Sequence, residues 1–128
     1  MEKINIPADT IWEDVVGYSR AVKAGNIIEI SGTAAVYKGK VIGKSNAYEQ
    51  TKFILEKIKN TLESLGSGMN DVIRTRIYVT DITKWEEIGR AHGEYFKNIK
   101  PATAMVEVKS LIDPDMLVEI EATAISNP

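Results

Sequence analysis

The 128-residue sequence contains no cysteine and only one histidine, His92. These absences exclude disulfides, thiolate metal sites, cysteine nucleophiles and metal sites built from several histidines. We therefore expect no metal site. Carboxylates, arginines, tyrosines, hydroxyls and backbone groups remain as the groups that could bind a ligand or carry out a reaction.

The sequence also lacks a large excess of one charge and a long apolar run. Its 16 basic and 18 acidic residues leave a net charge of −2, so no strong field favours nucleic acid or an anionic membrane as a partner. No segment approaches the length of about 20 apolar residues that crosses a bilayer. The first seven residues have no apolar stretch of signal-peptide length. We expect a cytoplasmic protein with no membrane partner.

The composition is otherwise that of an ordinary globular protein, with 44% hydrophobic and 27% charged residues. A chain of this length fits one domain rather than two, so residues 1–128 are assigned to a single domain.

Strand and helix patterns alternate along the chain after a loosely ordered lead-in that precedes Trp12. The patterns predict a hairpin over 21–31, a turn at 38–40, a helix over 46–65, a strand over 71–80, a helix over 83–97, and strands over 102–108 and 116–124. Two helices among five or six strands predict a two-layer α+β domain with both helices on one face of the sheet.

Successive side chains of a strand point to opposite faces of a sheet, which divides the strand residues into two sets. The apolar set is expected under the helices: Ile28, Ile30, Ala34, Ile73, Thr75, Ile77, Val79, Ala104, Val106, Val108, Val118, Ile120, Ala122 and Ala124. The mixed set is expected on the other face: Glu29, Ser31, Thr33, Arg74, Arg76, Tyr78, Thr103, Met105, Glu107, Glu119, Glu121 and Thr123. That face is either solvated or buried on a partner subunit, with a cleft between chains at its edge.

Several short stretches, taken in order and at their spacing, resemble one protein family. They are Gly17-Tyr18-Ser19, Ile30-Ser31-Gly32, Leu65-Gly66, Asp71-Val72, Tyr78-Val79-Thr80-Asp81, Pro101-Ala102, Val106-Glu107-Val108 and Val118-Glu119-Ile120-Glu121-Ala122. With them the chain resembles the Rid (reactive intermediate deaminase) family, also called YjgF, over about residues 17–124. The resemblance implies a chorismate-mutase-like fold and a homotrimer with clefts between subunits.

Members of that family that hydrolyse 2-imino acids hold a tyrosine, a serine-glycine pair, an arginine and a glutamate in the cleft. The residues that match this pattern here are Tyr18, Ser31, Gly32 and Glu119. An asparagine and a cysteine of the pattern are replaced by Gly89 and Met105.

The arginine of the pattern is missing, because Thr103 stands at its position. An arginine grips a carboxylate through a bidentate, charge-assisted fork, and each hydrogen bond to a charged group contributes roughly 1.5–3 kcal/mol. Arg76, predicted on the same face as Thr103 and Glu119, is a candidate replacement cation. Alternatively it pairs with a neighbouring glutamate or with another chain.

Roles for the matching residues follow from the resemblance and from their chemistry. Glu119 either accepts a proton from an attacking water or anchors the structure, and Tyr18 either forms a wall of the cleft or is an ordinary interface residue. No histidine base lies at a motif spacing from Ser31, so Ser31 is not expected to act as a nucleophile. Gly32 is instead expected to contact the ligand through its backbone N–H. Thr103 is a candidate lining residue, and His92 is predicted in the core.

The resulting prediction is a homotrimer that binds a small imine, enamine or keto acid between subunits. Its expected reaction is hydrolytic deamination of a compound like 2-iminopropanoate or 2-iminobutanoate, with water as the nucleophile and no cofactor. The first alternative is a non-catalytic small-molecule-binding or chaperone-like trimer. The second is an endoribonuclease or translation inhibitor, which the net charge of −2 disfavours.

Overall fold

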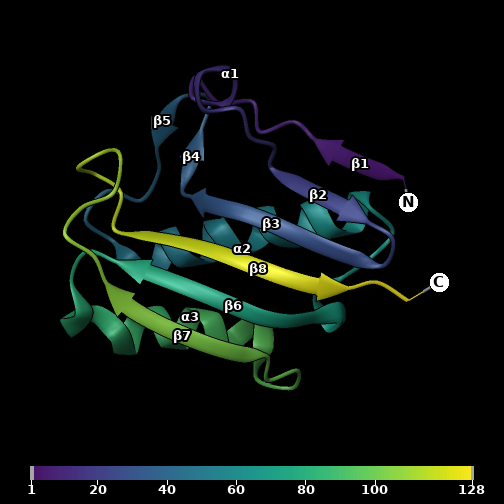
Figure 1. Ribbon diagram of the computed structural model, residues 1–128. Coiled ribbons are helices and arrows are strands. Elements are labelled where there is room, and N and C mark those ends of the chain that lie inside the picture. Colours follow the sequence, from purple (N-terminus) through teal and green to yellow (C-terminus); the bar gives the residue numbers. More distant parts are fainter. Residues whose placement is uncertain (1, 128) are drawn as a thin grey trace.

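A computed structural model describes residues 2–127. Figure 1 labels the elements, which are β1 (Lys3–Ile6), α1 (Glu13–Val16), β2 (Ala21–Ala24), β3 (Ile27–Ala34), β4 (Val36–Tyr37), β5 (Lys40–Val41), α2 (Ala47–Ser64), β6 (Val72–Val79), α3 (Trp85–Phe96), β7 (Ala102–Glu107) and β8 (Val118–Ile125). Six strands form one sheet in the order β1-β2-β3-β8-β6-β7, and β4 pairs with β5 separately. All neighbours in the six-stranded sheet are antiparallel except β6 and β7.

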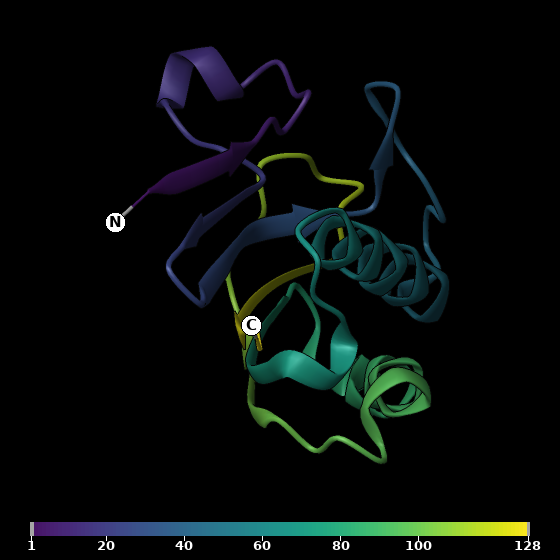
Figure 2. The ribbon, with the colours of Figure 1, turned by 90° about the vertical axis from the view of Figure 1, so that its right-hand side faces the viewer.

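Helices α2 and α3 cover the same face of the sheet, as the two-layer α+β prediction requires (Figure 2). The mixed sheet and its two covering helices confirm the predicted fold class. Within residues 2–127, no helix combines the length and the apolar character needed to cross a membrane.

Helix α2 forms where the sequence predicts it, because its start and its apolar stripe agree. The Asn46 side chain accepts a hydrogen bond from the Glu49 backbone N–H at 3.0 Å, which satisfies one of the free donors of the first turn. Ile54, Leu55 and Ile58 lie on one side of the helix and are fully buried against the sheet. Burial of each such side chain contributes about 1.5–3 kcal/mol.

Strand β8 alternates between the two faces as predicted. Val118, Ile120, Ala122 and Ala124 are buried under the helices, and Glu119 and Glu121 point to the other face. This central strand pairs with β3 on one side and β6 on the other, so its alternation determines which face the neighbouring residues take.

A bulge in β3 reverses the predicted orientation of the residues that follow it. The pairing with β8 shifts between Ile30 and Thr33, so that two residues, Ser31 and Gly32, lie opposite one residue of β8. Thr33 is consequently buried under the helices, although the strict alternation placed it on the open face and Ala34 inside. A similar shift at the start of β6 buries Val72 and leaves Ile73 51% exposed, although the sequence predicted Ile73 under the helices.

The predicted faces of β7 were also wrong. Thr103 pairs in register with Thr75, and Met105 with Ile77, so these side chains lie on the helix side of the sheet while Val106 is 48% exposed. Because β7 is an edge strand and neither of its faces is fully buried, its sequence carries little information about which face is inside.

Two further predictions differ from the structure. The helical spacing of Trp85, Ile88, His92 and Tyr95 predicts one buried stripe on α3, but Trp85 is 56% exposed, and Ala91 and Phe96 are buried together with Ile88. The segment before Trp12 is not a loose lead-in, because β1 pairs with β2 at the edge of the sheet and α1 follows it.

Candidate functional site

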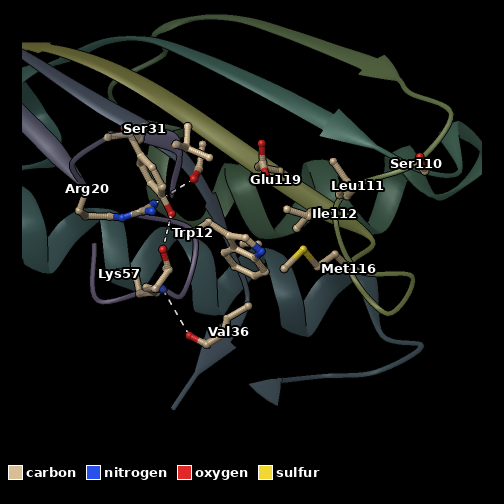
Figure 3. Close-up of a pocket in the computed structure, with 15 residues that line it drawn as sticks. Trp12, Arg20, Ser31, Val36, Lys57, Ser110, Leu111, Ile112, Met116 and Glu119 are labelled. Atoms are coloured by element: carbon tan, nitrogen blue, oxygen red, sulfur yellow. Dashed lines mark hydrogen bonds between the residues drawn. The ribbon is translucent and has the colours of Figure 1, made fainter. Parts of the chain in front are cut away.

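A cavity of about 450 Å³ lies at the end of the sheet where β3, β4 and β8 approach the segment from Thr10 to Arg20. The loop from Ser110 to Met116 closes it on the other side. Figure 3 shows Arg20 and Lys57 on one side of this cavity and Glu119 with the apolar loop side chains on the other.

Glu119 brings a carboxylate to the cavity from the open face of β8. Burial raises the pKa of the Glu119 carboxyl, the charge of Glu121 adds to this effect and Arg20 opposes it. No hydrogen bond joins the Glu119 carboxylate to another side chain within residues 2–127, so it is free to bind water or a ligand. A carboxylate with a raised pKa is better suited to accept a proton near neutral pH.

Gly32 allows the Glu119 carboxylate to approach the backbone of β3. A Cβ atom at position 32 would lie 2.5 Å from Oε2 of Glu119, which is inside van der Waals contact. The bulge at Ser31-Gly32 and the glycine together therefore determine where the carboxylate lies.

Arg20 is the most deeply buried charge of the cavity, at 7% exposure. Its Nη1 donates to the Gly32 carbonyl oxygen at 3.0 Å and to the Thr33 hydroxyl, which the bulge has turned inward. Its Nε is buried without a hydrogen-bond partner, and burial lowers the pKa of its guanidinium. Arg20 therefore supports the bulge and also carries a donor that no group within residues 2–127 satisfies.

Lys57 contributes a second cation from helix α2. Its Nζ donates to the Val36 carbonyl oxygen at 3.3 Å, and its stem is half-buried. Burial, and then the charge of Arg20, lower the pKa of the Lys57 ammonium. Neither cation was predicted from the sequence. The one available sign for Lys57 was its position next to the buried stripe of α2, three residues after Ile54.

The hydroxyls of the cavity are occupied by neighbouring groups. The Ser31 hydroxyl donates to the Ser19 carbonyl oxygen at 2.6 Å, which holds β3 to the segment before β2. The Tyr18 hydroxyl lies 2.6 Å from the Thr10 hydroxyl and so fixes the wall formed by the N-terminal segment. Within residues 2–127, neither hydroxyl is hydrogen-bonded to a base that would make it a nucleophile.

The remaining wall is apolar and is held in place by a buried glutamine. Trp12, Leu111, Ile112 and Met116 line this side of the cavity. The Gln50 amide, fully buried on α2, donates to the Asp115 carbonyl oxygen at 2.9 Å and accepts from the Leu117 backbone N–H at 2.9 Å. These bonds attach the loop before β8 to helix α2.

Thr103 does not lie with Glu119 on the open face, which corrects the sequence-based placement. Its hydroxyl is 2.8 Å from that of Thr75, and the Thr75 hydroxyl is 2.9 Å from Nε2 of His92 on α3. The reversed orientation of β7 directs Thr103 toward the helix layer. His92 thus belongs to an internal hydrogen-bonded cluster, and burial lowers the pKa of its imidazole.

Arg76 lies on the open face, where the sequence predicted it, but it does not line the cavity. It pairs across the sheet with Glu121, whose carboxylate accepts a hydrogen bond from the Tyr78 hydroxyl at 2.8 Å. Of the six residues that the sequence analysis named, Tyr18, Ser31, Gly32 and Glu119 therefore line one cavity, and Arg76 and Thr103 lie outside it.

The sequence that forms this cavity matches a known family model. The model described as Endoribonuclease L-PSP matches residues 11–126. A RutC family protein of Pyrococcus horikoshii is 39% identical over 109 residues, which are 84% of this chain and 85% of that protein. The chain belongs to the YjgF/RutC (Rid) family.

Two further relatives connect the family to a structure and to an activity. The crystal structure of a YjgF/YER057c/UK114 family member from Mycobacterium tuberculosis is 40% identical, with a TM-score of 0.88, and the match covers 97% of this chain and 99% of that one. The 3-aminoacrylate deaminase RutC of Acinetobacter baylyi is 34% identical over 108 residues, covering 84% of this chain and 85% of that protein.

Proposed function

We propose that this Rid-family protein hydrolyses small anionic imines or enamines to the carbonyl compound and ammonia. The observation that carries the proposal is the half-buried Glu119 carboxylate, whose pKa is raised, beside Gly32 in a cavity that also holds two cations. The identity with a 3-aminoacrylate deaminase supports the same class of reaction.

In the proposed reaction, Glu119 accepts a proton as a water oxygen bonds to the imine carbon, and it returns this proton to the nitrogen to give the tetrahedral adduct. The hydroxyl proton of the adduct is then transferred to the amine as the C–N bond breaks, so that ammonia leaves and the carbonyl forms. An enamine enters the same route after protonation at its β-carbon gives the imine. Tyr18, Ser31 and Gly32 shape the site, and general base catalysis of this kind contributes typically 10²–10⁴-fold.

We further propose a homotrimer in which a neighbouring subunit completes the cleft. Ile73 and Val106 are about half exposed on the open face of the sheet, which supports burial of this face on another copy of the chain. Thr103 does not line the cavity of its own chain.

The cytoplasmic location stays a prediction.

A direct test generates 2-iminopropanoate in place with a pyridoxal-phosphate-dependent dehydratase and follows its trapping by semicarbazide. The proposed activity reduces the trapped fraction in proportion to the concentration of this protein. Unchanged trapping at all protein concentrations, repeated with 3-aminoacrylate, would contradict the proposal.

A second candidate function is binding without catalysis. The observation that favours it is the position of the family arginine, where Thr103 instead bonds to Thr75 on the helix side of the sheet. In that case keto acids bind to the cavity, and the protein does not accelerate the decay of imines.

A further inference from the structure

Two cations line the cavity, and neither forms an ion pair with a carboxylate of residues 2–127. Within residues 2–127, the ion pairs involve Lys44, Lys52 and Lys59, all exposed, and neither Arg20 nor Lys57. Glu119 is the only carboxylate among the described residues that line the cavity. With both cations protonated, these three groups leave the cavity with one net positive charge, and an anion can neutralise it.

Lys57 also retains unused hydrogen-bond donors. Its ammonium has three N–H donors and uses one of them within residues 2–127, on the Val36 carbonyl oxygen. The Nε of Arg20 has no partner within residues 2–127 and no contact with solvent, so Arg20 acts on a ligand through its charge rather than through this donor. Like charges held close together in a half-buried site destabilise each other, and a shared anion reverses that effect.

The position of Lys57 suits recognition of a ligand rather than support of the fold. Its single bond to a backbone carbonyl at 3.3 Å is long, whereas Arg20 holds the bulge through Nη1. Figure 3 shows the two basic side chains entering the cavity from the same side, opposite Glu119. A ligand with one anionic end therefore meets the cations at that end and the carboxylate at the other.

We propose that Lys57, with Arg20 beside it, is the carboxylate-anchoring residue of this site. It supplies the cation that the resemblance assigns to an arginine and that Thr103 cannot provide. The ligand class is then small carboxylates that carry a carbonyl, imine or enamine group. The assignment of the carbonyl, imine or enamine group of the ligand rests on the proposed function, whereas the assignment of the subsite for its carboxylate does not.

The test uses pyruvate, a stable keto acid, and its neutral counterpart pyruvamide as probes in NMR titrations of the full chain. The wild type is expected to bind pyruvate more tightly than pyruvamide. Lys57→Met removes the charge and keeps the stem, and it is expected to weaken pyruvate binding about ten- to hundredfold while leaving pyruvamide binding within about twofold.

The matched control is Lys59→Met, which removes an exposed lysine of the same helix that pairs with Glu56 and Glu63. It is expected to leave both affinities unchanged. Lys57→Arg retains a cation and is expected to retain the preference for pyruvate, and it provides the comparison if the methionine variant does not fold.

Equal binding of pyruvate by the wild type and by a folded Lys57→Met variant would overturn the anchor, as would equal affinity of the wild type for both probes. A lysine-dependent preference for pyruvate in a protein that does not hydrolyse imines would support the anchor and contradict the proposed function. Hydrolysis that survives Lys57→Met with an unchanged KM would support the proposed function and contradict the anchor.

Discussion

Two polar clusters of this protein, one between the sheet and α3 and one at the cavity at the end of the sheet, differ in how completely their groups are hydrogen-bonded. In the cluster of Thr75, His92 and Thr103, each side chain bonds to another member of the cluster. In the cavity, the Glu119 carboxylate accepts no side-chain hydrogen bond within residues 2–127, and Arg20 Nε is buried without a partner. Because buried polar groups are normally satisfied, unsatisfied groups that converge on a cavity indicate a ligand site.

Burial affects a titratable group in each of the two clusters, with different consequences for the protein. Burial favours the neutral form of both side chains, because it lowers the pKa of the His92 imidazole and raises the pKa of the Glu119 carboxyl. Neutral His92 can join the internal hydrogen bond to Thr75, which stabilises the fold. A carboxylate with a raised pKa at the edge of a cavity can instead exchange a proton with a ligand.

The largest expected effect is that of Glu119→Gln, which removes the proposed base and keeps the shape of the side chain. We expect kcat/KM for imine hydrolysis to fall about 10²- to 10⁴-fold with little change in thermal stability. The control is Glu121→Gln, two residues along the same strand on the same face and outside the cavity. Equal losses of kcat/KM in the two variants would contradict a specific role for the Glu119 carboxylate as the base.

Gly32→Ala tests whether the position of Glu119 matters as well as its charge. The added Cβ would meet Oε2 of Glu119 at 2.5 Å, so the carboxylate must move. A displacement of about 1 Å at a reacting group can reduce activity about 10²-fold. Gly68→Ala is the control, because no atom lies within 4 Å of a Cβ there. Full activity in Gly32→Ala would show that the close approach is not needed.

The raised pKa of Glu119 predicts how activity and stability depend on pH. Only the ionised carboxylate accepts a proton, so kcat/KM is expected to rise about tenfold per pH unit below the pKa and to level off above it. The folded state binds this proton more tightly than the unfolded state, so the stability contributed by Glu119 is present at low pH and lost as the pH rises through the folded pKa. Comparing the unfolding free energy of wild type and Glu119→Gln from the ordinary carboxyl pKa upward measures this directly.

Thr75→Val tests the satisfied cluster and has the smallest expected effect on function. It removes the hydroxyl that bonds to both His92 and Thr103 without changing the side-chain shape. The Thr103 hydroxyl keeps its bond to the Pro101 carbonyl oxygen, but leaving the half-buried His92 Nε2 unpaired is expected to cost about 1–3 kcal/mol of unfolding free energy. Hydrolysis should be unchanged at temperatures where the variant is folded. Thr123→Val, at an exposed hydroxyl that bonds to Glu29, is expected to change stability by less than about 0.5 kcal/mol. A large loss of activity in Thr75→Val would place this cluster in the site.

The elements that the sequence predicted well are those with a strong local pattern. Helix α2 has an N-cap at Asn46 and one buried stripe, and β8 alternates without interruption. Tyr18, Ser31, Gly32 and Glu119 came from the family resemblance, and the fold brings them to one cavity. Their roles remain proposals.

The errors in the predicted strand faces come from bulges and from the edge position of β7. The bulge at Ser31-Gly32 turns Thr33 inward, and the edge position of β7 leaves the orientation of Thr103 undetermined by hydrophobicity. Arg20 and Lys57 were missed because their burial depends on segments distant in the sequence, which cover them only in the folded chain.

The most direct test of the account is a crystal structure of the protein with pyruvate bound. We expect pyruvate in the cavity, with its carboxylate on Lys57 and Arg20 and its carbonyl carbon facing Glu119. Pyruvate held elsewhere, with the Glu119 cavity occupied only by water, would contradict the account.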